Sequence, residues 1–243
     1  MRIAFLTGAG MSAESGVPTF RDALTGLWQR FDAEALATQD AYRRDPALCW
    51  GWYRWRARRV QEAKPNAGHL GIAELATSQD VTVVTQNVDD LHERAGSRDV
   101  IHLHGSLFAS RCLDCGAPAT GEDPILRDQQ RIPPDGGREQ PPPCADCGGA
   151  MRPGVVWFGE SLPEGAWDMT MRQLAGCDLL VVIGTSGLVY PAAGLPELAR
   201  RAGVRIIEIN PQSSAISRLA DEHWAVGAGE GLARLRQTLA SAG

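Results

Sequence analysis

The stretch Ile3-Ala-Phe-Leu-Thr-Gly-Ala-Gly-Met-Ser-Ala13 joins a short apolar run to a loop of small residues. Gly8, Gly10 and Ala13 fit the G-x-G-x-x-G/A pattern that follows the first strand of many dinucleotide-binding domains. Small residues let the backbone approach a pyrophosphate, and the next helix offers free amide hydrogens to the anion. A tight strand-to-helix turn without a ligand gives the same pattern, so the rest of the chain must distinguish the two.

Further apolar runs predict a parallel sheet around this first strand. They are nearly continuous in hydrophobicity, as strands covered on both faces should be, and helical patterns separate them. The alternation predicts an α/β fold with a Rossmann-like, doubly wound parallel sheet. The predicted strands are Ile3–Leu6, Val81–Thr85, Val100–Leu103, Leu179–Ile183, Val204–Ile209 and a short His223–Val226, and the predicted helices include His69–Ala76, Ala192–Ala202 and Ser214–Asp221.

Two regions interrupt this alternation and predict a small inserted domain. Residues 31–77 have a helical pattern, and residues 109–153 hold four cysteines. We therefore predict that residues 1–30, 78–108 and 154–243 form the nucleotide-binding domain, and that the active cleft lies between the two domains.

The bulk composition excludes several classes of protein. Apolar residues make up 44% of the 243 residues, enough for a substantial core. A net charge of −5 gives no reason to expect direct nucleic-acid binding. The longest apolar run is far shorter than the roughly 20 residues of a membrane-spanning helix. Because Met1-Arg2 leads at once into the first strand, we expect a cytoplasmic protein without a targeting segment. We also expect a monomer.

Four cysteines form two paired hooks, Cys112-x-x-Cys115 and Cys144-x-x-Cys147, separated by a long loop. In a reducing compartment such pairs are more often metal ligands than disulfides. Four thiolates satisfy tetrahedral zinc and leave no open coordination position. The spacing therefore predicts one structural Zn²⁺ ion.

His104 ends a predicted strand and directly precedes Gly105. Doubly wound sheets place their ligands outside the carboxyl ends of strands, and an imidazole can accept a proton at neutral pH. A single histidine is nevertheless more often structural than catalytic. His102, two residues earlier, is the alternative base. The remaining histidines are expected to be structural or surface residues: His69, His92 and His223.

Several motifs, taken together, resemble those of the sirtuins, the NAD-dependent protein deacylases. They follow the order of that family and extend over about residues 3–228. The motifs are Gly8-Ala-Gly-Met-Ser-Ala-Glu-Ser-Gly-Val-Pro-Thr-Phe-Arg-Asp22, Thr85-Gln-Asn-Val-Asp-Asp-Leu-His92, His104-Gly105, Val156-Trp-Phe-Gly-Glu160, Gly184-Thr-Ser186 and Asn210-Pro211.

The resemblance implies that NAD is a co-substrate and is consumed, giving nicotinamide and O-acyl-ADP-ribose, with a structural zinc ion away from the chemistry. His104 is then the general base, and Asn87 and Asp89 line the nicotinamide and ribose pocket. A polar turn in which Asp89 caps the next helix remains the alternative for those two residues. The residues expected to bind NAD are Gly8, Ala9, Gly10, Ala13, Glu14, Phe20, Arg21, Gln86, Asn87, Asp89, Gly184, Thr185, Ser186, Asn210 and Ala228.

The same resemblance implies a protein substrate that carries an acylated lysine and binds through its peptide backbone. The segment Val155–Glu160 is similar to the strand that pairs with the substrate, a mode that uses main-chain hydrogen bonds. The residues expected to contact the substrate in this segment are Val156, Trp157, Phe158, Gly159 and Glu160.

A predicted helix runs from Asp45-Pro46, a cap followed by proline, to Lys64-Pro65. Tyr53 and Arg56 are three residues apart on it and share a face, which is either an acid-binding pair or a solvated surface. In one sirtuin class, which resembles the human mitochondrial desuccinylase, a Tyr-x-x-Arg pair faces the end of the acyl pocket, and Ala23 matches a small residue that widens it. On this helix we expect Trp52 and Trp55 to pack inward and Arg54, Arg58 and Arg59 to be solvated.

The resemblance therefore predicts removal of succinyl and malonyl groups, and also acetyl groups, from lysine, because a guanidinium binds a carboxylate through two parallel hydrogen bonds. A predominantly deacetylating enzyme is the main alternative. A non-catalytic zinc protein that binds NAD and acyl-lysine, and an enzyme that transfers ADP-ribose to proteins, are further alternatives.

Overall fold

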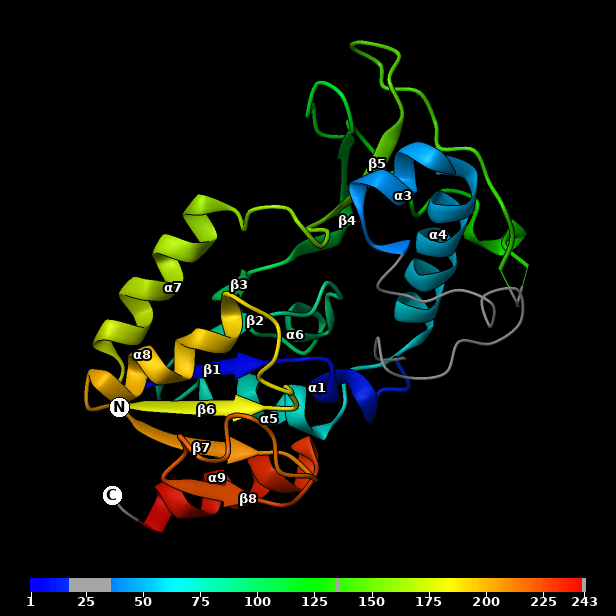
Figure 1. Cartoon of the computed structure of the whole chain (residues 1–243). Helices are drawn as coiled ribbons and strands as arrows, with labels where there is room; N and C mark the ends of the chain where they lie inside the picture. Colours follow the sequence, from blue (N-terminus) through cyan, green and yellow to red (C-terminus); the bar gives the residue numbers. More distant parts are fainter. Residues whose placement is uncertain (18–35, 134–135, 242–243) are drawn as a thin grey trace. The chain divides into compact units, whose positions relative to one another are not determined.

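The computed structural model of the chain describes residues 1–17, 36–133 and 136–241 (Figure 1). Three of the predicted site residues, Phe20, Arg21 and Ala23, lie outside these ranges. The chain divides into two compact units. The first, which we call the sheet unit, consists of Met1–Thr19, Lys64–Leu103 and Leu162–Gly243, and the second consists of Phe20–Ala63 and His104–Ser161. These bounds place residues 64–77 with the sheet, and residues 104–108 and 154–161 with the second unit.

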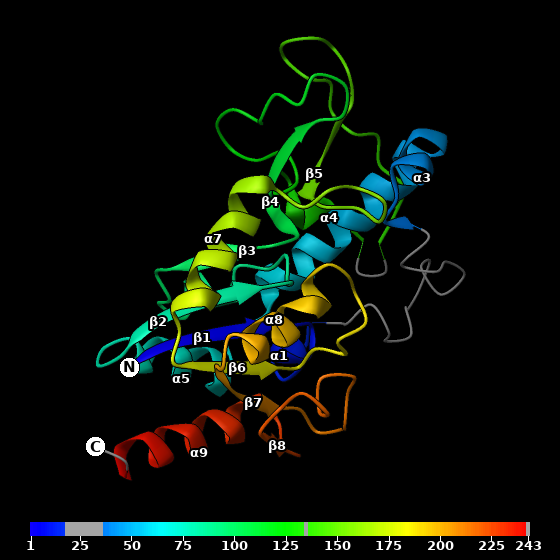
Figure 2. The ribbon, with the colours of Figure 1, turned by 60° about the vertical axis from the view of Figure 1, so that its left-hand side comes forward.

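The sheet unit is built on six parallel strands in the order β3-β2-β1-β6-β7-β8 (Figure 2). The chain adds β2 and β3 on one side of β1 and then crosses to place β6, β7 and β8 on the other side. The point where the order reverses lies between β1 and β6, which is where doubly wound sheets bind their ligands. The bounds are β1 Arg2–Thr7, β2 Asp80–Thr85, β3 Val100–His102, β6 Leu179–Ile183, β7 Arg205–Ile209 and β8 Glu222–Trp224.

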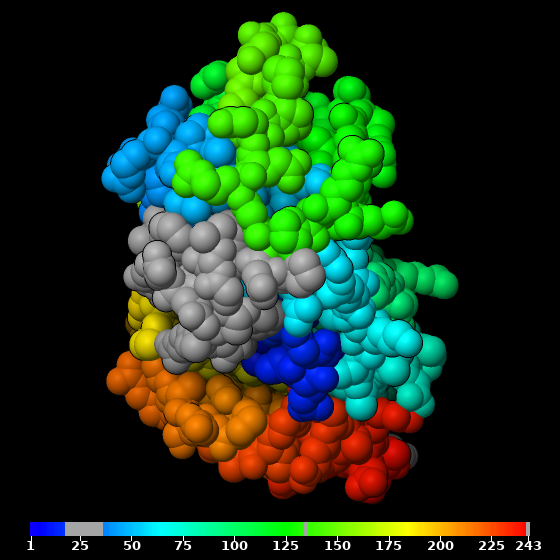
Figure 3. Space-filling view, turned by 90° about the vertical axis from the view of Figure 1, so that its right-hand side faces the viewer, coloured from blue at the N-terminus to red at the C-terminus, as the bar shows by residue number. Residues whose placement is uncertain are grey.

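Helices cover both faces of this sheet, as the nearly continuous apolar strands predict. Alternate residues of β1 point to opposite faces: Ile3 and Phe5 pack with α5 (Ala67–Leu75) and α9 (Ala228–Ser241). Ala4 and Leu6 pack with α7 (Glu164–Gly176) and α8 (Leu195–Arg201), which follows the short η3 (Ala192–Gly194). Figure 3 shows α9, in red, beside α5, in cyan. The doubly wound prediction is confirmed.

One predicted helix is wrong. Residues 214–221 form a series of turns. Ser214 and Ser217 both donate hydrogen bonds through their hydroxyls to the buried Glu208 carboxylate, and the Ser214 N–H donates to Ser217 Oγ at 2.9 Å. Serine side chains compete with helical backbone bonds in this way, and the apolar spacing of the segment does not reveal it.

The second unit combines a helical part with a two-stranded antiparallel sheet. The strands are β4 (Gly105–Cys112) and β5 (Met151–Val155), and the helices are α3 (Gln39–Arg44) and α4 (Pro46–Glu62), with a 3-10 turn η2 at Gln129–Arg131. The Asp45 side chain accepts a hydrogen bond from the Leu48 N–H at 3.1 Å, and Pro46 occupies the first helical position. The predicted start of α4 is thereby confirmed, and the helix ends at Glu62, just before the predicted stop at Lys64-Pro65.

The packing of α4 differs from the expectation at one arginine. Trp52 and Trp55 are buried, as predicted, but Arg54 is also buried, with only 3% of its surface exposed. Its guanidinium pairs with Glu139 at 3.2 Å and donates to the Pro124 carbonyl at 2.8 Å. A buried arginine needs such partners, and they come from a loop distant in sequence. The prediction of a solvated Arg54 was wrong because the helix pattern carries no sign of that loop.

Among the described residues, no helix combines the length and the apolar character that crossing a membrane requires.

Candidate active site

The glycine loop after β1 packs against the loop after β6 at the reversal point of the sheet. The Gly8 N–H donates to Ile183 O at 2.9 Å, and the Gly10 N–H donates to Gly184 O at 2.8 Å. A Cβ on Gly10 would lie 2.7 Å from the Gly184 Cα, and Gly184 itself has φ +61°. Glycine is therefore required at both positions by close backbone approach. The helix that follows, α1, spans only Gly10–Ala13.

Three buried polar side chains meet beside this loop. Ser12 Oγ donates to Asp89 Oδ2 at 2.9 Å and accepts from Asn87 Nδ2 at 3.1 Å. Burial raises the pKa of the Asp89 carboxyl above its usual value. Asp89 Oδ1 also accepts from the Leu91 N–H at 3.2 Å, at the start of α6 (Leu91–Arg94), so the carboxylate also caps that turn. Sequence reasoning did not include Ser12, although it lies inside the quoted glycine stretch.

Polar groups after β2, β6 and β7 are linked through Thr185. Gln86 Nε2 donates to Thr185 Oγ1 at 3.1 Å, and Asn210 Nδ2 donates to the Thr185 carbonyl at 3.0 Å. Near the start of α9, Glu14 Oε1 accepts from the Gly229 N–H at 3.4 Å. The sheet unit contains every predicted NAD-binding residue that the structure describes: Gly8, Ala9, Gly10, Ala13, Glu14, Gln86, Asn87, Asp89, Gly184, Thr185, Ser186, Asn210 and Ala228.

A buried histidine pair, which sequence reasoning did not place in the site, is linked to Asn87 through Thr7 and Thr85. The His69 and His92 rings have centroids 4.8 Å apart, and His92 Nε2 lies 3.1 Å from Thr7 Oγ1. Thr7 donates to Thr85 Oγ1 at 2.9 Å, which in turn accepts from the Asn87 N–H at 3.0 Å. Burial lowers the pKa of His69 to about 4 and that of His92 to about 3, so both rings are neutral at pH 7.

His102, the alternative base, is held in place by Glu93. Its Nε2 lies 2.6 Å from Glu93 Oε1, and its Nδ1 lies 3.1 Å from the Asn87 carbonyl. Burial is the largest single influence and lowers the pKa of His102, but the hydrogen bond and negative charge of Glu93, together with the Asn87 carbonyl, leave the pKa above its usual value. Both ring nitrogens are thus occupied within the sheet unit.

His104 stands at the entry to β4 in the second unit. Its carbonyl accepts a hydrogen bond from the Val156 N–H at 2.8 Å. The following Gly105 has φ +71°, and a Cβ on it would lie 2.2 Å from the Gly154 carbonyl oxygen. Glycine is therefore required at position 105 by the backbone itself, because no side chain fits where β4 meets β5.

The proposed acyl-recognition pair lies on α4. Tyr53 is 2% exposed, and its hydroxyl accepts a hydrogen bond from Trp157 Nε1 at 2.9 Å. Arg56 is partly buried, with its guanidinium carbon 5.0 Å from the centroid of the Trp52 ring. Burial raises the pKa of the Tyr53 phenol, although the positive charge of Arg56 opposes this. The solvated-surface alternative does not hold for Tyr53.

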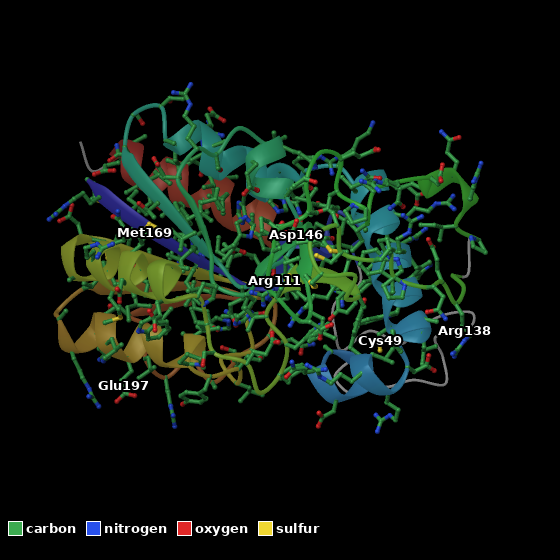
Figure 4. All side chains as sticks on the ribbon, turned by 90° about the horizontal axis from the view of Figure 1, so that it is seen from above. Cys49, Arg111, Arg138, Asp146, Met169 and Glu197 are labelled. Carbon is green, nitrogen blue, oxygen red and sulfur yellow. The ribbon has the colours of Figure 1, made fainter. Side chains whose placement is uncertain are left out.

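The segment predicted to pair with substrate is less regular than a strand. β5 ends at Val155, and beyond it Phe158 forms an isolated parallel bridge with Thr38. The N–H groups of Val156, Trp157, Phe158 and Glu160 all donate within the second unit. Glu160 also pairs with the buried Arg152, and Arg111, labelled in Figure 4, lies 3.8 Å from the same carboxylate.

The four cysteines of the paired hooks converge at the end of β4, whose last residue is Cys112. All four Sγ atoms lie within 4.8 Å of one another, with Cys112 3.5 Å from Cys147 and Cys115 3.8 Å from Cys144. Tetrahedral zinc with Zn–S bonds of about 2.3 Å separates its sulfurs by about 3.8 Å. The backbone N–H groups of Asp114 and Gly149 also point at Sγ atoms, as thiolates require. The cluster fits a structural zinc ion.

The chain belongs to the Sir2 family, whose model matches residues 8–191. An NAD-dependent protein deacylase of Corynebacterium glutamicum is 50% identical over 242 residues, covering 98% of this chain and 92% of the relative. One of Pseudomonas putida with the same name is 53% identical over 209 residues, covering 86% of this chain and 78% of the relative.

Two solved structures extend the comparison. A Sir2 homologue in complex with NAD is 44% identical, with a TM-score of 0.86, and the match covers 99% of this chain and 90% of that one. A Sir2 complex with a p53 peptide and NAD is 29% identical, with a TM-score of 0.82 over 97% of this chain and 92% of that one.

Removing zinc should unfold the second unit, because coordination at four-thiolate sites is worth on the order of 10–16 kcal/mol. We expect one zinc per chain by elemental analysis, its loss in Cys144→Ser, and a lower melting temperature after chelation. Cys177→Ser, outside the cluster, is the control and should retain the metal. A demonstrably metal-free sample with unchanged melting temperature would contradict the assignment.

Acid should destabilise the sheet unit through the buried histidine pair. In the unfolded chain both residues take up a proton below about pH 6.5, whereas in the folded chain they resist it down to pH 3–4. The unfolded state therefore binds more protons in this window. Lowering the pH from 7 to 5 thus reduces the free energy of unfolding by on the order of 1–2 kcal/mol per histidine. Urea titrations should show a flatter pH dependence for the double variant His69→Gln/His92→Gln. An equally steep fall in that variant would exclude the pair as the cause.

Proposed function

We propose that this chain removes acyl groups that end in a carboxylate, succinyl and malonyl, from lysine side chains of proteins. The chain is an NAD-dependent protein deacylase of the Sir2 family, as its relatives at about 50% identity are. The acyl preference is the further step. It rests on one observation, the placing of Tyr53 and Arg56 one turn apart on α4 with the phenol buried.

The chemistry of this pair suits a terminal acid. A guanidinium donates two parallel hydrogen bonds to a carboxylate, and a phenol adds a third donor. Hydrogen bonds to a charged group contribute on the order of 1.5–3 kcal/mol. An acetyl group offers no acid to these donors, so the pair favours the longer acidic groups through charge as well as through size.

The sheet unit supplies the groups suited to holding NAD. The glycine loop after β1 follows the pattern that binds a pyrophosphate in dinucleotide-binding domains, and Asn87 and Asp89 present polar groups suited to a ribose and a carboxamide. NAD, when bound, supplies the ribose carbon that accepts the acyl oxygen as nicotinamide leaves. The NAD complex of a structural relative with a TM-score of 0.86 supports this assignment.

The second unit carries the residues that we assign to the substrate and to proton transfer. His104 is the proposed general base, since a neutral imidazole accepts a proton near pH 7. The segment 156–160 is the proposed site for the peptide backbone. Its N–H groups at four positions are already used, so a bound peptide meets chiefly its carbonyls. Relatives bound to a p53 peptide support a protein substrate, and four zinc-binding thiolates support a reducing, cytoplasmic setting.

A second activity, removal of acetyl groups, has its own support. One structural relative, 44% identical, holds 2′-O-acetyl-ADP-ribose, and another, 31% identical, holds a deacetylated p53 peptide with 3′-O-acetyl-ADP-ribose. Acetyl-lysine is smaller than succinyl-lysine and needs no acid-binding group. We therefore expect both activities, with the acidic groups preferred.

Arg56→Met should lower kcat/KM for a succinyl peptide by about 10-fold or more, the loss of one charged hydrogen-bonding group. Turnover of the matched acetyl peptide should fall by much less. Nicotinamide release, measured by chromatography on both peptides, gives the ratio. Arg59→Met, an exposed arginine of the same helix, is the control and should leave the ratio unchanged. Equal losses on both peptides would mean that Arg56 does not recognise the acid.

His104→Ala should lower deacylation of both peptides by about 100-fold or more, in line with the usual contribution of a general base. Thermal melting tests whether the variant is folded. His102→Gln, which alters the alternative base, should retain most of the activity. The reverse outcome would assign the base to His102, and no NAD-dependent nicotinamide release by the wild type would indicate a non-catalytic protein.

A further inference from the structure

The hydrogen bond between Trp157 and Tyr53 has a fixed direction. An indole nitrogen can only donate, so Tyr53 accepts through its hydroxyl oxygen, and the two atoms are 2.9 Å apart. The phenol proton must then point away from Trp157. The direction of this one bond therefore sets the direction in which Tyr53 itself can donate.

The phenol proton has no acceptor in the described part of the chain. Tyr53 is 2% exposed, so bulk water does not solvate it freely. A buried hydroxyl that accepts one hydrogen bond and donates none is half satisfied. An oxygen brought by a ligand would complete it, and a carboxylate oxygen is the strongest acceptor that an acyl chain offers.

Trp157 is held so that its indole has one orientation. Its backbone N–H donates to Glu160 Oε2 at 2.9 Å, and its ring contacts both the Arg152 guanidinium, 3.4 Å from the ring centroid, and the Tyr42 ring, at 5.0 Å. Arg152 is buried and is itself fixed by Glu160 and by the Val155 carbonyl at 2.8 Å. The direction of the Nε1–H bond is therefore determined by contacts within the second unit.

We propose that Trp157 is a positioning residue for acyl specificity: its indole N–H holds the Tyr53 hydroxyl so that the phenol proton is directed at the terminal carboxylate of a succinyl or malonyl group. The inference rests on the proposed preference for acidic acyl groups. Donation by the indole also polarises the phenol and makes it a stronger donor. An acetyl group, which carries no acid, gains nothing from this arrangement.

The test is the substitution Trp157→Phe, which keeps an aromatic ring beside Arg152 and Tyr42 and removes the indole N–H. The ratio of kcat/KM for matched succinyl and acetyl peptides should fall by about 3- to 10-fold, the value of one neutral hydrogen bond. The loss should lie mainly in KM for the succinyl peptide. In a Tyr53→Phe background the same substitution should not change the ratio further, because the two residues act through one bond.

The matched control is Trp224→Phe in the sheet unit. Trp224 is also buried, and its indole donates to Glu222 Oε2 at 3.0 Å, so this variant loses a comparable bond elsewhere. Its succinyl-to-acetyl ratio should stay at the wild-type value. A shift as large as that of Trp157→Phe would overturn the inference, because the effect would then reflect general loosening.

The outcomes distinguish the proposed function from the proposed role of Trp157. A wild type that shows no succinyl preference would overturn the proposed function and, with it, the inference. A wild-type preference that Arg56→Met removes and Trp157→Phe leaves intact would overturn the inference alone. If Trp157→Phe does not fold, the indole N–H resonance of Trp157 in the wild type replaces it: succinyl peptide should shift this resonance more than acetyl peptide, and equal shifts would overturn the inference.

Discussion

The whole arrangement depends on how closely two backbone loops approach each other where the sheet reverses its order. Gly8 and Gly10 donate to the carbonyls of Ile183 and Gly184, and a single Cβ at Gly10 or Gly184 would push the loops apart. This contact and the ladder between β1 and β6 bring together the carboxyl ends of β2, β6 and β7, which present Gln86, Asn87, Thr185 and Asn210. The clustering of polar groups suited to a dinucleotide thus depends on the absence of side chains at Gly10 and Gly184.

In the second unit the corresponding constraint is the ion pair between the buried Arg152 and the partly buried Glu160. Arg152 and Glu160 together hold the backbone and the ring of Trp157, and Trp157 holds Tyr53. Burying two charges adds little net stability, since desolvation offsets their attraction. Its value here is positional: Arg152 also donates to the Val155 carbonyl and Glu160 also lies near Arg111, so the pair ties the segment after β5 to its neighbours. The proposed acyl recognition by Tyr53 therefore depends, through Trp157, on this ion pair.

Sequence patterns predicted the features that depend on local spacing. The strands were found because burial on both faces makes them apolar throughout, and the zinc cluster because two Cys-x-x-Cys pairs leave few other roles for their thiols. Features that depend on distant partners were missed. Arg54 is buried because it pairs with Glu139 and the Pro124 carbonyl. Ser12 and the His69–His92 pair contact residues from separate strands and loops. Ser214 donates to Glu208, and its segment forms turns in place of a helix. Such partners have no fixed offset in sequence, so no periodic pattern predicts them.

The chain order of the sheet has a consequence for how the protein comes to its native state. β1 (Arg2–Thr7) is an interior strand, yet its neighbours β2 and β6 are made only after residue 79 and residue 178, and the chain between β1 and β6 includes the whole second unit. During synthesis on the ribosome β1 can pair with β2 once residue 85 has emerged, but its other edge stays unpaired until β6 is made, after the complete second unit. A nascent chain stalled before Leu179 would expose a hydrophobic edge, which makes the timing of translation, and access to chaperones, part of how this sheet is assembled.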